Sequence, residues 1–154
     1  DVAVDLDRAV FAAPDFDLAR VLGGSMKSGD LKGNVVVVDF IATWCPPCIE
    51  ELPTYNALFE KYKGKNVRVI GIVLESRSLD EVKAKLAQLD IRYPVLLGTE
   101  KTTSDFDVYV FPAALVLTKD WTIHRRHSEV AANKKRLIEQ EIEQLLLEPH
   151  NAQR

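Results

Sequence analysis

The stretch VVVVDFIATWCPPC, residues 35–48, decides how the rest of the chain is interpreted. Its first seven residues are nearly all apolar and mostly β-branched, which favours a strand buried on both faces of a sheet. Proline residues then separate Cys45 from Cys48, and helical periodicity follows. A buried strand that leads into a Cys-x-x-Cys pair at the start of a helix is typical of a reactive dithiol.

The predicted start of the helix gives the two thiols different roles. The unpaired N–H groups and the positive end of the helix dipole favour a thiolate at Cys45. Cys48, one turn further along, is placed to attack a mixed disulfide formed at Cys45 and release the product. We therefore predict a redox pair in which Cys45 attacks and Cys48 resolves.

Length and composition indicate one ordinary globular domain. The chain has 154 residues, 47% of them hydrophobic and 28% charged, enough to bury a sizeable core. We predict a single domain over residues 1–154, with its core at about 13–147. The net charge of −3 gives no electrostatic case for nucleic acid. The basic runs at 125–126 and 134–136 are interpreted as solvated faces of a strand and a helix.

The start of the sequence and its cysteine count limit the possible form of the chain and the possible roles of its cysteines. The sequence begins at Asp1, shows no signal-peptide pattern and contains no apolar segment long enough to span a bilayer. We expect a mature or trimmed form. Both cysteines of the chain lie in the motif, so they form either a redox pair or half of a metal site.

Periodicity and turn residues predict alternating helices and strands. A strand, a helix and a second strand in this order imply a right-handed crossover and parallel pairing. At the N-terminal end we expect a short helix or packed arm at 1–12 and a small hairpin around Gly23-Gly24. The elements expected after Cys48 are a helix kinked at Pro53, a strand at 67–74, a helix from Ser78 to about Asp90 that buries Leu79, a strand near 93–97 and a short helix at 102–106. The chain should then form a hairpin of 113–117 and 121–127 and a closing helix at 129–147 with Leu137 or Ile138 on its buried side, followed by a frayed tail after Pro149.

The motif residues resemble a known group of proteins. Asp39-Phe40, the run 44–48 and Pro53 look like the active-site segment of the thioredoxin superfamily, and the Cys-Pro-Pro-Cys order resembles its TlpA/ResA/DsbE-like branch of extracytoplasmic thiol-disulfide oxidoreductases. The resemblance covers roughly residues 13–147. It implies an α/β, thioredoxin-like fold: a central mixed β-sheet flanked by helices, with an N-terminal hairpin extension.

The same resemblance implies a substrate-binding rim. Residues 108–113 (VYVFPA) resemble the loop in which this superfamily carries a cis-proline facing the dithiol. We therefore expect a cis bond between Phe111 and Pro112, with the Phe111 backbone beside Cys45, where it would grip an extended partner. A plain strand-start proline is the alternative. Many relatives have a smaller or β-branched residue where Phe111 stands. Trp44 is expected to cover the rim.

Two acids are candidates for proton transfer. Burial of Asp39 in an apolar strand would raise its pKa towards neutrality, which suits a proton carrier for Cys48. The alternative is a structural acid paired with a lysine, but the lysine that thioredoxins carry on the next strand is not evident at 67–74. Glu51, three residues after Cys48, matches a functional glutamate of ResA-like proteins. Its alternative role is a surface charge that favours the helix dipole.

The resemblance implies a reductase of extracytoplasmic protein disulfides, of the cytochrome c maturation or oxidase assembly type. Its partners would be protein thiols and disulfides and a membrane thiol donor of the DsbD/CcdA type. We expect a periplasmic or otherwise extracytoplasmic monomer that needs no organic cofactor, binds no nucleic acid and holds no metal. The direction of electron flow is not encoded in any residue pattern.

Three other functions compete with this prediction. Two soft thiols could hold Cu(I) in a binding or scaffold module, although no Met- or His-rich tract accompanies them. A zinc site would need further ligands, and His124 and His127 are expected on opposite faces of a strand. A thiol peroxidase of the peroxiredoxin kind would need Thr-x-x-Cys, whereas Thr43 lies only two residues before Cys45.

Overall fold

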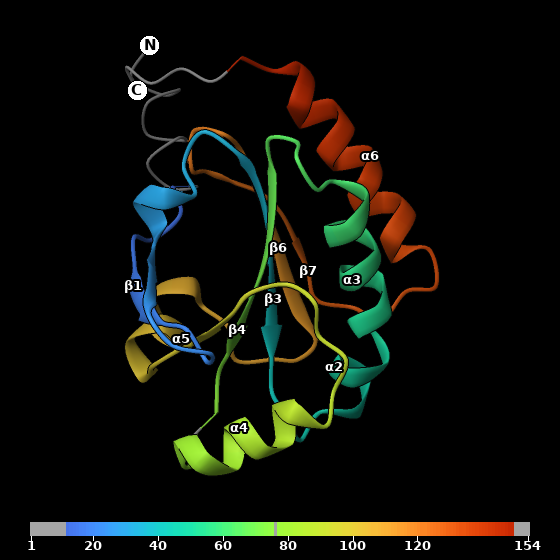
Figure 1. Cartoon of the computed structure of the whole chain (residues 1–154). Coiled ribbons are helices and arrows are strands. Elements are labelled where there is room, and N and C mark those ends of the chain that lie inside the picture. Colours follow the sequence, from blue (N-terminus) through green and yellow to red (C-terminus); the bar gives the residue numbers. More distant parts are fainter. Residues whose placement is uncertain (1–11, 76, 150–154) are drawn as a thin grey trace.

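A five-stranded mixed sheet forms the centre of the molecule in the computed structural model, which describes residues 12–75 and 77–149 (Figure 1). The strand order is β5-β4-β3-β6-β7. The strands are β3 (Val35–Ile41), β4 (Val67–Val73), β5 (Val95–Leu97), β6 (Ala113–Leu117) and β7 (Ile123–His127). The expected arm at 1–12, apart from Ala12, and the tail after Pro149 lie outside the described residues.

Strand β3 is the middle of this sheet. It pairs in parallel with β4 along its whole length and antiparallel with β6. All seven of its residues are buried, as the apolar run predicted. Because side chains alternate across a strand, its odd-numbered and even-numbered valines enter different core clusters on the two faces of the sheet.

Helices cover one face, and a helix with the N-terminal hairpin covers the other. Helices α3 (Leu52–Lys61) and α6 (Lys134–Leu147) lie side by side on the first face (Figure 1). The second face carries α5 (Glu100–Phe106) and a separate two-stranded sheet of β1 (Asp17–Ala19) and β2 (Ser25–Lys27), followed by the 3-10 turn η1 (Ser28–Asp30). The thioredoxin-like fold and the hairpin extension are confirmed.

The active-site helix is interrupted, as Pro53 predicted. Helix α2 (Pro46–Glu50) ends at Glu50, α3 starts at Leu52, and Glu51 is the cap residue between them. Proline in the first turn of α3 costs no hydrogen bond there, but its ring prevents the two helices from continuing as one. Glu51 therefore belongs to neither helix and lies at the break between them.

Several element boundaries differ from the sequence-based prediction. Helix α6 begins at Lys134, five residues later than expected, and Trp121 lies in the β6–β7 turn with a positive φ. The prediction that Leu79 is buried was wrong. It is the first residue of α4 (Leu79–Ala87), directly after the Ser78 cap, and is 46% exposed. The first turn of a helix can project beyond the core that its later residues contact.

The buried side of α6 supplies a stability test. Ile138 is fully buried, whereas its neighbour Leu137 is 36% exposed. Ile138→Ala should lower the free energy of unfolding by about 2–5 kcal/mol, because it removes buried methylene groups and leaves a cavity. Leu137→Ala should lower it by about 1 kcal/mol or less. Equal losses in denaturant titrations would contradict the described packing of α6.

Candidate dithiol active site

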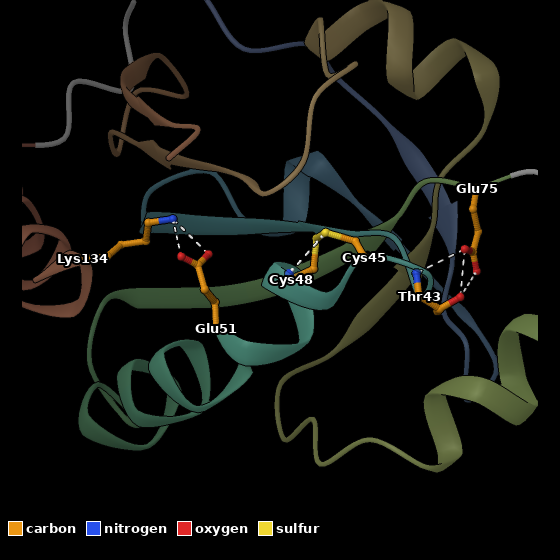
Figure 2. Close-up of a disulfide and its surroundings, with 6 residues drawn as sticks. All are labelled: Thr43, Cys45, Cys48, Glu51, Glu75 and Lys134. Atoms are coloured by element: carbon orange, nitrogen blue, oxygen red, sulfur yellow. Dashed lines mark hydrogen bonds and ion pairs between the residues drawn. A yellow bond between two sulfur atoms is a disulfide. The ribbon is translucent and has the colours of Figure 1, made fainter. Parts of the chain in front are cut away.

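The two cysteines are joined by a disulfide at the start of α2 (Figure 2). Their Cα atoms are 5.3 Å apart, and Cys45 is the N-cap residue of the helix. The strand β3 ends four residues earlier, so the rigid centre of the sheet fixes the position of the sulfurs. The structure therefore presents the oxidised form of the predicted redox pair.

The start of α2 offers its first N–H group to one sulfur. Pro46 and Pro47 have no N–H, so the first donor in the helix is the N–H of Cys48, which donates to the Cys45 Sγ at 3.3 Å. A donor aimed at Cys45 stabilises negative charge on that sulfur. Exposure does not distinguish the two residues, because each is 3% exposed.

Aromatic side chains form the rim beside the disulfide. The Phe111–Pro112 peptide bond is cis, as the family resemblance implied. Phe111 packs against the small cluster of Ala42, Cys45 and Cys48. Its ring also meets the half-exposed Trp44 edge-on, with centroids 5.7 Å apart. The expected rim residues are therefore assembled around the sulfurs, and their part in binding a partner stays a prediction.

Asp39 is buried within β3, six residues before Cys45, and is hydrogen-bonded to a tyrosine. It is 4% exposed, and its Oδ2 accepts a hydrogen bond from the Tyr93 hydroxyl at 2.8 Å. Burial is the largest influence on its pKa and raises it to about 8, although the Tyr93 hydrogen bond acts in the opposite direction. Asp39 thus holds its proton at neutral pH in the oxidised form.

Gly71 makes room for this tyrosine. It pairs with Asp39 across β3 and β4, and a Cβ atom at this position would lie 3.1 Å from the Tyr93 ring. The position on β4 nearest to Asp39 thus carries no side chain, and the tyrosine approaches from the segment before β5. No lysine donates a hydrogen bond to Asp39 within the described ranges, so a directly paired lysine is not its structural explanation.

Glu51 is buried and forms an ion pair with Lys134. The Lys134 Nζ donates to both carboxylate oxygens, at 2.9 and 2.7 Å (Figure 2). Glu51 is therefore not the surface charge of the alternative interpretation. The interpretation of the run 134–136 as a solvated helix face was also wrong at its first residue, because Lys134 is 3% exposed.

A third acidic side chain, that of Glu75, supports the loop before Cys45. The Thr43 hydroxyl lies 2.6 and 2.9 Å from the two carboxylate oxygens of Glu75, and the Thr43 backbone N–H also donates to Glu75, at 3.2 Å (Figure 2). Sequence reasoning assigned no such role to either residue. The two lie 32 positions apart, and a threonine beside an apolar strand carries no signal of a distant partner.

Neither a metal cluster nor a membrane-crossing helix occurs in the described parts of the chain. No group of three or more His, Cys, Asp or Glu side chains is arranged to hold a metal ion there. His127 instead lies 2.8 Å from a carboxylate oxygen of Glu141 on α6. None of the helices described combines the length and apolar content that crossing a membrane requires.

The Thr43–Glu75 contact can be tested by an isosteric change. Thr43→Val removes the hydroxyl donor and leaves a partly buried carboxylate short of a partner, so unfolding should cost about 1–3 kcal/mol less. Thr54→Val is the matched control, because the Thr54 hydroxyl has no hydrogen-bond partner among the described residues. A loss no greater than that of the control, measured by urea unfolding of the oxidised protein, would show that the contact adds no stability.

The buried acid predicts a pH dependence of stability. Folded Asp39 keeps its proton to about pH 8, whereas the unfolded chain releases it near its ordinary pKa of 3.8. Between these values the unfolded state binds fewer protons, so this group lowers the free energy of unfolding as pH rises. Oxidised Asp39→Asn should therefore gain stability relative to wild type, by about 1 kcal/mol or more, between pH 5 and pH 8. A difference that is constant with pH would contradict the raised pKa.

Comparisons with known proteins agree with this geometry. The AhpC/TSA family profile matches residues 11–127. The thioredoxin-like protein YneN of Bacillus subtilis (strain 168) is 30% identical over 132 residues, covering 85% of this chain and 76% of YneN. The thiol-disulfide oxidoreductase ResA of Bacillus cereus is 34% identical over 110 residues, covering 70% of this chain. The chain matches only 62% of the length of that ResA.

Solved structures show the same fold. A crystal structure of a putative thiol:disulfide interchange protein DsbE from Chlorobium tepidum has a TM-score of 0.79 and 30% identity, covering 88% of this chain and 96% of that one. The exposed lipoprotein thioredoxin Etrx1 of Streptococcus pneumoniae has a TM-score of 0.77 and 25% identity, covering 86% and 100%. The profile match over most of the chain and the similarity to YneN show that this protein belongs to the AhpC/TSA family of thioredoxin-like proteins.

Proposed function

We propose that the protein is a thiol-disulfide oxidoreductase that reduces disulfides of extracytoplasmic proteins. One observation carries the proposal: the disulfide at the start of α2 packs against Phe111 of the aromatic rim, and the strand that leads to it carries the buried Asp39, whose pKa is raised to about 8. Similarity to the thiol-disulfide oxidoreductase ResA and to the interchange protein DsbE supports the reaction class. The rim would bind the partner, and the acid would exchange protons with the dithiol.

The proposed reaction passes two electrons from the dithiol to the substrate. The Cys45 thiolate attacks one sulfur of the substrate disulfide, and the other substrate sulfur leaves as a thiolate. Cys48 then gives its proton to Asp39 and attacks the Cys45 Sγ, which releases the second substrate thiol and closes the Cys45–Cys48 disulfide. A protonated Asp39 together with a closed disulfide is the state that this proton transfer would leave behind.

A redox titration tests both the activity and its direction. Trp44 lies directly before Cys45 and contacts the Phe111 ring, so its fluorescence should report opening of the disulfide. We expect one reversible two-electron transition near the reducing end of the thioredoxin-like range, at about −270 mV, and none in Cys45→Ser. A value near about −120 mV would instead assign a disulfide donor, and the absence of a transition would exclude the oxidoreductase.

The separate roles of the cysteines predict different trapping behaviour. Cys48→Ser, reduced before mixing, should accumulate a mixed disulfide with a substrate protein that carries a disulfide, because Cys45 attacks that bond but the resolving thiol is missing. Cys45→Ser should accumulate far less, because the Cys48 sulfur lacks the helix N–H donor that the Cys45 sulfur has. Non-reducing electrophoresis measures the difference. Equal trapping by both variants would refute the assignment of Cys45 as nucleophile.

The cellular setting is part of the proposal. The partners would be protein thiols and disulfides, in cytochrome c maturation or oxidase assembly, with a membrane thiol donor of the DsbD/CcdA type restoring the dithiol. An extracytoplasmic location is supported by the similarity to Etrx1, described as an exposed lipoprotein. We propose that the protein acts as a monomer and without an organic cofactor.

A thiol peroxidase is the second candidate, because the N–H of Cys48 donates to the Cys45 Sγ and would stabilise a thiolate there that could also attack a peroxide. The Thr43 hydroxyl is engaged by Glu75, and Cys45 is already paired with Cys48, which speaks against a separate peroxide-binding thiol. Steady consumption of hydrogen peroxide with a thiol donor, faster than disulfide exchange, would make the peroxidase the leading candidate in place of the oxidoreductase.

A further inference from the structure

We propose that Lys134 is a positioning residue for dithiol exchange: it holds the Glu51 carboxylate as a buried, charge-balanced pair beside the dithiol and thereby sets the pH at which Asp39 and Cys48 exchange a proton. The inference rests on the proposed function and adds a residue from the closing helix to its site. Lys134 would act through Glu51 and Asp39, without touching the substrate.

The geometry singles out this pair. The side chains of Lys134 and Glu51 are 3% and 10% exposed. Among the lysine and arginine ion pairs of the described residues, every other pair has at least one side chain that is more than 40% exposed. Figure 2 shows the pair on one side of the disulfide and the Thr43–Glu75 contact on the other.

Stability alone does not account for such a pair. Removing two charges from water is costly, and buried ion pairs can often be replaced by apolar side chains without loss of stability. The location is what distinguishes the pair, because Glu51 occupies the break between α2 and α3, three residues after Cys48. The break turns its carboxylate away from the helix surface and towards α6.

The charges of the pair act on Asp39 with opposite signs. The Glu51 carboxylate raises the pKa of Asp39 and the Lys134 ammonium lowers it, with Glu51 the stronger of the two. The other titratable groups that face Asp39 are Tyr93, which donates to it, and Tyr55, whose own pKa is raised by burial and by both acids. Neither tyrosine carries charge at neutral pH, so the ion pair is the charged neighbour that acts on Asp39.

Opposite charges predict opposite effects when each is removed alone. Lys134→Met leaves the carboxylate uncompensated, so Asp39 should keep its proton to a higher pH. Glu51→Gln leaves the ammonium uncompensated, so Asp39 should lose its proton at a lower pH. The double variant removes both charges and should return close to the wild-type value. A merely structural role predicts that both single changes weaken folding, with no reason for pH shifts of opposite sign.

The resolving step can be followed directly. Reduced protein is mixed with 5,5′-dithiobis(2-nitrobenzoate): the attack by Cys45 releases one thionitrobenzoate, and the attack by Cys48 releases the second. The pH midpoint of the second release should rise by about half a unit or more in Lys134→Met and fall by a similar amount in Glu51→Gln. Lys135→Met is the matched control, because Lys135 is the exposed neighbour that pairs with Glu139 on α6.

The outcomes separate the two proposals. Failure of the wild-type protein to exchange protein disulfides refutes the proposed function. The role of Lys134 is refuted, and the proposed function is not, if the wild type is active but the pH midpoints of both single variants shift in the same direction. The same conclusion follows if the midpoint of the double variant does not return close to the wild-type midpoint. Should Lys134→Met not fold, the exchanged pair Glu51→Lys with Lys134→Glu keeps the attraction and carries the test. The pH midpoint of this exchanged pair must fall below that of wild type, because position 51, which has the stronger effect on the pKa of Asp39, then holds the positive charge.

Discussion

The hydrogen bond between the Tyr93 hydroxyl and the buried Asp39 carboxyl is the interaction on which the site depends. A carboxyl group in the centre of a sheet is costly unless it is neutral or paired. Here it is kept neutral by burial and satisfied by a tyrosine, and Gly71 on the adjacent strand provides the space. The strand that carries Asp39 also leads into the cysteines, so the acid and the dithiol are fixed to one rigid element.

The sequence predicted those parts of the molecule that depend on neighbouring residues. The apolar run at 35–41, the Cys-Pro-Pro-Cys motif and Pro53 each act within a few positions, and they yielded the buried strand, the dithiol and the interrupted helix. The cis bond before Pro112 came from a family resemblance. The N-terminal hairpin was predicted from turn residues such as Gly23-Gly24, and both of these glycines have positive φ values in the structure.

The partners of the acids could not be predicted in this way. Tyr93 lies 54 positions from Asp39, Glu75 lies 32 positions from Thr43, and Lys134 lies 83 positions from Glu51. Tertiary packing alone decides these contacts, and each residue type has a commoner role on the surface or in the core. Lys134 was misjudged for this reason, because the charged run in which it lies is otherwise solvated, as the exposed Lys135 shows.

The ion pair also links the site to the order in which the chain is made. Synthesis proceeds from the N-terminus, and the sheet strands, the dithiol and Glu51 all precede helix α6 along the chain. A nascent chain that ends before Lys134 would already contain both cysteines and Asp39 but would lack the cation that balances Glu51. Docking of the last helix would then be the step that brings the dithiol to its mature reactivity, and early intermediates would exchange disulfides with a different pH dependence.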